Sequence, residues 1–126
     1  DRVLFAARMA ERDMAAHARR NEARRPVFFD RGLPDVVGYL RLSGLPVPET
    51  LDQAARTLRY RPSVFIAPFW PEIFAQDAER RQDAAEARRT VEAMAAVYPA
   101  YGYNLIALPK ATVNDRMAFV LERLRS

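Results

Sequence analysis

The run Ser63-Val64-Phe65-Ile66-Ala67-Pro68 decides the fold class of this 126-residue chain, because it is apolar on both faces and bounded by proline. Such a strand is typical of a parallel sheet that is covered on each side. A second run, Tyr103-Asn104-Leu105-Ile106-Ala107-Leu108, stops at Pro109. A shorter β-prone run, Val27-Phe28-Phe29, follows Pro26 and ends at Asp30. We therefore expect strands at residues 27–30, 63–68 and 103–108.

Apolar residues at helical spacing precede and separate these strands. They predict a long amphipathic helix from Val3 to His17 and a shorter one that stops near Gly44. A third helix is expected from Thr50, which stands in capping-box register with Gln53.

Two further helices follow the second and third predicted strands. Asp77 is expected to cap a long, charged helix that ends at Pro99 and Gly102. The last helix opens at Thr112 and has a predicted buried stripe of Met117, Val120, Leu121 and Leu124. Strands that alternate with helices predict an α/β fold, a parallel sheet with helices on both faces, within a single domain.

Composition excludes some classes of protein. The chain has no cysteine, so disulfides, thiolate metal sites and cysteine nucleophiles are excluded. No apolar run is long enough to span a bilayer, and we expect a cytoplasmic protein with no membrane partner. The net charge is +4, and Lys110 is the only lysine among 20 basic residues.

Ligands of open α/β sheets bind beyond the carboxyl ends of the strands. The residues expected there are Asp30 with Arg31, the stretch 68–70 and the stretch 109–112. A carboxylate at the position of Asp30 can orient a magnesium ion, its water ligand or a substrate hydroxyl. The equally weighted alternative is a turn in which Asp30 accepts backbone hydrogen bonds.

Several segments, in order, carry a resemblance to a known family. They are Val27-Phe28-Phe29-Asp30-Arg31-Gly32-Leu33-Pro34-Asp35 with Tyr39 downstream, residues 67–72, residues 77–83, and residues 102–109 with Arg116. Together they resemble the NadR-like AAA domains, which are predicted ATPases and small-molecule kinases of the P-loop class. The resemblance covers nearly the whole chain and implies a P-loop NTPase-like fold that binds ATP or GTP with Mg²⁺.

The resemblance also implies roles for individual residues. Asp30 would be the Walker-B-like, metal-side carboxylate or the substrate-facing base, and Arg31 would hold substrate or phosphate. Arg80 and Arg81 match a lid whose arginine approaches the transferring phosphate; otherwise they form a solvated helix face. The remaining candidates are Asp35, Tyr39 and Trp70 on the side of an unknown small-molecule substrate, and Pro109, Lys110, Ala111 and Thr112 beside the nucleotide base.

The sequence departs from that family in its phosphate-binding loop. Nothing matches Gly-x-x-x-x-Gly-Lys-Ser/Thr, whose amides and lysine cradle the phosphates. We expect the chain, which begins at Asp1, to be the carboxyl-terminal portion of a longer protein and to be inactive alone. The absent first strand would lie between residues 27–30 and 63–68. Either those strands pair directly, another chain fills the gap, or exposed sheet edges favour self-association.

Two other functions stay open. Arginine pairs at 19–20, 24–25, 80–81 and 88–89 suggest an RNA- or phosphate-surface binder, although interleaved acids make nucleic acid an unlikely partner. A non-catalytic interaction module that uses the open sheet edge is the other alternative. His17, the only histidine, is expected to be a packed imidazole.

Overall fold

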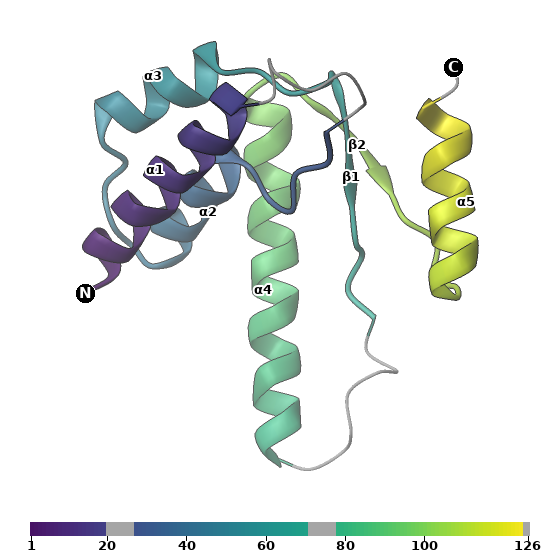
Figure 1. Ribbon diagram of the computed structural model, residues 1–126. Helices are drawn as coiled ribbons and strands as arrows, with labels where there is room; N and C mark the ends of the chain where they lie inside the picture. Colours follow the sequence, from purple (N-terminus) through teal and green to yellow (C-terminus); the bar gives the residue numbers. More distant parts are fainter. Residues whose placement is uncertain (20–26, 71–77, 125–126) are drawn as a thin grey trace.

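A two-stranded parallel sheet stands between helices in this chain (Figure 1). The computed structural model describes residues 1–19, 27–70 and 78–124, with side chains in the last range from Asp83 onward. Strand β1 covers Ser63–Ile66 and strand β2 covers Asn104–Ala107. They pair in register from Ser63 opposite Asn104 to Ile66 opposite Ala107.

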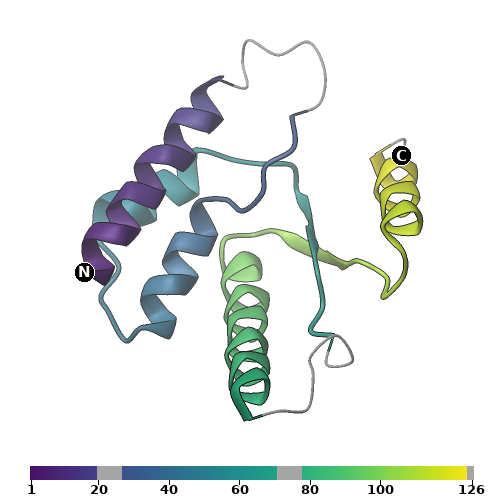
Figure 2. The ribbon, with the colours of Figure 1, turned by 60° about the horizontal axis from the view of Figure 1, so that its bottom comes forward.

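Five helices complete the described part of the chain. Helix α1 covers Arg2–Arg19, α2 covers Leu33–Leu42 and α3 covers Glu49–Thr57, all before β1. Helix α4 covers Ala78–Ala100, between the strands, and α5 covers Val113–Leu124 after β2. Apart from the strand expected at residues 27–30, the element order agrees with the α/β prediction. Helices α4 and α5 lie on opposite sides of the strand pair (Figures 1 and 2).

The core lies around α2, which α1, α3 and α4 surround. Val36, Val37 and Leu40 are buried, as their helical spacing in the sequence predicts, and Leu33 is fully buried as well. Val97 of α4 is buried against them. Helix α2 ends as predicted, since Gly44 adopts a φ of +70°, a left-handed conformation that glycine tolerates without steric cost.

The predicted strand at residues 27–30 is wrong. These residues are irregular, and Val27 and Phe28 are exposed. A β-prone segment becomes a strand only when a neighbouring strand takes its backbone hydrogen bonds, and β1 pairs only with β2 among the described residues. The described sheet therefore has two strands instead of the three expected.

Two predictions about helices also need correction. The expected buried stripe of α5 is not buried: Met117 and Leu121 are exposed, and the helix has no buried residue. Helix α3 begins at Glu49, one residue before the expected cap Thr50, with Pro48 at the N-cap. Asp77, the predicted cap of α4, lies outside the described residues, whereas Thr112 accepts the Asp115 amide at the start of α5 as expected.

Among the described helices, none combines the length and apolarity needed to cross a membrane.

The packing of α2 yields a stability prediction with a matched control in the same helix. Leu40 is 2% exposed and Leu42 is 42% exposed. We expect Leu40→Ala to lower the free energy of unfolding by about 2–5 kcal/mol, because it leaves a cavity in the core. Leu42→Ala should change it by less than about 0.5 kcal/mol. Urea unfolding followed by circular dichroism measures both, and equal losses would contradict this account of the core.

Candidate functional site

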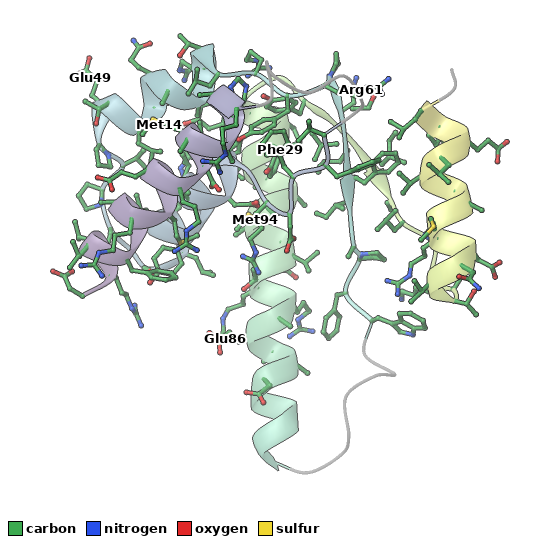
Figure 3. The ribbon with its side chains drawn as sticks, viewed as in Figure 1. Met14, Phe29, Glu49, Arg61, Glu86 and Met94 are labelled. Atoms are coloured by element: carbon green, nitrogen blue, oxygen red, sulfur yellow. The ribbon has the colours of Figure 1, made fainter. Side chains whose placement is uncertain are left out.

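A groove of about 950 Å³ lies along β1 and is the main candidate site. Residues 27–32 form one wall and residues 63–67 another. Residues of α4 between Thr90 and Tyr98 line it as well, and Val120 and Leu124 contribute from α5. In Figure 3, Phe29 and Met94 mark this region, with Arg61 beside the start of β1. Its volume is at the upper end of the range of small-molecule sites, about 300–1,000 Å³.

The groove collects three of the predicted site residues: Asp30, Arg31 and Asp35. Asp30 and Arg31 belong to the turn that leads from residues 27–29 into α2, and Asp35 stands in the first turn of that helix. Arg31 has a φ of +75°, a left-handed conformation that costs a non-glycine residue roughly 1–2 kcal/mol. A conformation of that cost persists only where the surrounding structure holds it.

Asp35 has a structural function in this turn. Its carboxylate is 7% exposed and accepts hydrogen bonds from the Gly32 amide at 2.8 Å and from the Tyr98 hydroxyl at 3.2 Å. It stands at the third position of α2, where a carboxylate satisfies an amide that the helix leaves unpaired. The predicted contact between Asp35 and a substrate stays a prediction.

Burial raises the pKa of Asp35 above its ordinary value, against the lowering effect of the two hydrogen bonds and of Arg31. The pKa of Asp13 on α1 is also raised, first by burial and then by the charge of Asp35. Two carboxyl groups of neighbouring helices therefore interact beside the turn, and the Arg31 guanidinium partly offsets their charge.

Aromatic side chains from several parts of the chain pack beside the same turn. We call this group the aromatic cluster, and its members are Phe29, Tyr60, Tyr98, Tyr103 and His17. The rings of Phe29 and Tyr60 lie 5.2 Å apart between centroids, and those of Tyr98 and Tyr103 lie 5.7 Å apart. His17 is buried, as expected, with its Nε2 2.8 Å from the carbonyl oxygen of Arg59.

Asp30 differs from Asp35 in exposure and in its contacts. It is exposed, and no hydrogen bond to its carboxylate occurs among the described residues. The alternative interpretation of Asp30, a carboxylate that caps the turn, thus describes Asp35 instead. Within residues 1–19, 27–70 and 78–124, no three His, Asp or Glu side chains gather to hold a metal ion.

Of the other predicted site residues, those with described side chains do not line the groove. Tyr39 is half-buried and its ring meets Phe5 of α1 at 5.4 Å. Half-buried Trp70 follows β1, and residues 109–112 follow β2, so both stretches stand beyond the carboxyl ends of the parallel strands as expected. Arg80 and Arg81 belong to α4, but their side chains lie outside the described part. The functions of all these residues stay predictions.

Sequence reasoning missed Tyr60, which contacts the turn through both its hydroxyl and its ring. Its hydroxyl accepts the Leu33 amide at 3.1 Å, and its own amide donates to the Tyr103 hydroxyl at 3.0 Å. Tyr60 lies in the connection between α3 and β1, where no periodic pattern marks a buried residue. Tyr98 and Tyr103, which contact this turn or Tyr60, are both buried.

The residues of this chain fit only part of a nucleotide site. Asp30 is an exposed carboxylate on the groove, where a single carboxylate together with nucleotide phosphates can hold Mg²⁺. The phosphates have no matching cradle, because glycines at 32, 38, 44 and 102 and the one lysine at 110 form no phosphate-binding loop. The given sequence therefore has an exposed carboxylate on the groove and no phosphate-binding loop of this pattern.

The raised pKa of Asp35 predicts a pH-dependent contribution to stability. Because the folded state binds this proton more tightly than the unfolded state, the contribution is complete below the ordinary value of 3.8 and is lost as pH rises through the raised pKa. Asp35→Asn removes this titration and also the effect of Asp35 on Asp13. Relative to the variant, we expect the wild-type free energy of unfolding to fall as pH rises from about 4. Urea titrations of both proteins at several pH values measure it, and parallel curves would refute it.

A family model described as an AAA domain matches residues 1–116. No curated protein and no solved structure matches the sequence. The match covers most of the chain, including the groove turn, β1, α4 and β2. The chain therefore belongs to this family of AAA domains, which indicates nucleotide-binding, ATPase- or kinase-like function.

Proposed function

We propose that the protein binds a nucleoside triphosphate, ATP or GTP, with Mg²⁺ and transfers or hydrolyses its terminal phosphoryl group. The acceptor is water or a small molecule. In this proposal residues 1–126 form the metal and substrate side of the site. A strand with its phosphate-binding loop, contributed by residues outside this sequence, occupies the groove and completes it.

The observation that carries the proposal is the groove against the edge of β1 that has no partner strand among the described residues. The amides of Asn104 and Leu108 donate to the carbonyls of Pro62 and Ile66. In a parallel pair, alternate residues direct their backbone groups to the same neighbour. Ser63 and Phe65 therefore direct their N–H and C=O groups toward the other edge, where the groove lies.

The chemistry of the groove walls also fits an added strand. Val91 and Met94 of α4 line it from one side of the sheet, and Val120 and Leu124 of α5 from the other. A strand on the β1 edge would have apolar side chains on both faces, like β1 itself. It would bury apolar surface of α5, a helix that has no buried residue among the described ones.

Asp30 and Arg31 would act at the end of this strand. When bound, the nucleotide–Mg²⁺ group supplies the phosphoryl group and neutralises its charge. Asp30 orients the metal or accepts the proton of the attacking hydroxyl, and Arg31 attracts an anionic group of the substrate. In this proposal the lid arginine that approaches the transferring phosphate is Arg80 or Arg81. The loop beside the nucleotide base is formed by residues 109–112.

Asp30→Asn in the full-length protein tests the chemical part of the proposal. We expect turnover of the nucleotide to fall by about 100-fold, because the neutral amide neither accepts the proton nor holds the metal charge. Nucleotide binding, measured by calorimetry, should change much less.

The matched control is Glu49→Gln, an exposed carboxylate on α3 away from the groove (Figure 3). It loses the same charge and should leave turnover unchanged. Equal turnover in wild type and Asp30→Asn would remove Asp30 from the mechanism.

Hydrogen exchange in the full-length protein tests whether a strand occupies the groove. We expect the amides of Ser63 and Phe65 to be as well protected as those of Asn104 and Leu108, because an added strand would accept their hydrogen bonds. Two-dimensional NMR resolves these four amides. Fast exchange at Ser63 and Phe65 beside slow exchange at Asn104 and Leu108 would show an open β1 edge and contradict the added strand.

A further inference from the structure

We infer that Tyr60 is a positioning residue: its hydroxyl and ring fix the turn of residues 30–35 and thereby aim Asp30 and Arg31 at the groove. The catalytic part of this inference rests on the proposed function. The mechanical part stands on the hydrogen bonds and ring contacts of the turn, and a separate measurement tests it.

The turn needs support from outside its own backbone. Arg31 has a positive φ, which is unfavourable for a residue with a side chain. The first amides of a helix also have no partner within the helix. At the start of α2 the amides of Gly32 and Leu33 have no backbone acceptor within the helix, and each donates its hydrogen bond to a side chain.

The two acceptors differ in origin. Asp35 belongs to α2 itself, so its bond to Gly32 shapes the turn locally. Tyr60 lies 27 residues beyond Leu33, so its bond ties the turn to the segment that enters β1. That bond therefore fixes where the turn stands relative to the groove.

Other side chains hold Tyr60 in place. The Tyr103 hydroxyl accepts its amide proton, and the rings of Phe29 and His17 meet its ring edge-on at 5.2 and 5.4 Å. Tyr103 lies just before β2, Phe29 lies in the groove wall and His17 lies in α1. Because these partners hold the Tyr60 ring from three parts of the chain, few positions are open to it.

Gly32 adds an independent observation. A Cβ atom at this position would stand 3.0 Å from the Tyr60 ring, closer than van der Waals contact permits. Its φ of −149° is open to any residue, so the close approach of the ring, and not the backbone conformation, favours glycine there. The ring forms the surface against which the turn lies.

Tyr60→Phe in the full-length protein is the test, because it removes the hydroxyl and keeps the ring. We expect hydrogen exchange at the Leu33 amide to quicken at least about tenfold, since its acceptor is lost. We expect kcat to fall while KM for the nucleotide changes less than twofold, because the variant misplaces Asp30 without touching the phosphate cradle.

Tyr101→Phe is the matched control. It removes a hydroxyl that donates to Asp52 of α3 at 2.7 Å and not to the turn, and so it should leave Leu33 exchange and kcat unchanged. Gly32→Ala is a second variant that keeps the hydroxyl but displaces the ring, and it should reproduce the fall in kcat.

The two readouts separate the two proposals. Leu33 exchange as slow in Tyr60→Phe as in Tyr101→Phe would overturn the positioning function. Faster exchange with an unchanged kcat would overturn its link to catalysis. A wild-type protein without any nucleotide turnover would refute the proposed function, whereas Leu33 exchange would still decide whether Tyr60 supports the turn.

Discussion

The burial of α2 is the constraint on which the rest of the described structure depends. Leu33, Val36 and Val37 have no exposed surface, so α2 cannot shift without opening the core shared with α1 and α4. The turn that carries Asp30 and Arg31 is the direct N-terminal extension of this helix. The site therefore takes its position from the packing of the core, while Asp30 itself stays exposed and accessible.

The burial of apolar side chains differs greatly between parts of the described structure. Helix α2 buries Leu33, Val36 and Val37, whereas the start of α1 exposes Val3, Leu4 and Phe5. Beyond β1, the α5 helix exposes Val113, Met117 and Leu121. Large apolar side chains in contact with water lose the stabilisation that burial would give, about 25 cal/mol per Å². Val120 and Leu124 of the same helix line the groove, beside the edge of β1 that has no partner strand among the described residues. Under the proposed function, a strand added on that edge would pair the backbone groups of β1 and cover these two side chains.

Local patterns predicted the elements whose partners are near in sequence or strongly apolar. The stripe of α2, the stop at Gly44 and the strands β1 and β2 all follow from such patterns. The strand at 27–30 and the buried stripe of α5 failed because both depend on neighbours that local sequence does not specify. At the site, Asp30 and Arg31 line the groove, although the strand end at which the sequence analysis expected them is not formed. Tyr60 was missed, because its contact with Leu33 spans 27 residues and depends on the tertiary fold.

Under the proposed function, the lack of one partner strand explains both the irregular conformation of residues 27–30 and the groove along β1. Residues 27–29 have the composition of a buried strand, yet Val27 and Phe28 are exposed beside the groove. Their β propensity is not expressed without a partner, because an isolated extended segment leaves its amides to water. An element inserted along β1 would present a second edge toward residues 27–29 and supply that partner. The same insertion would then place Asp30 at the carboxyl end of a strand, the position from which its predicted chemistry was first argued.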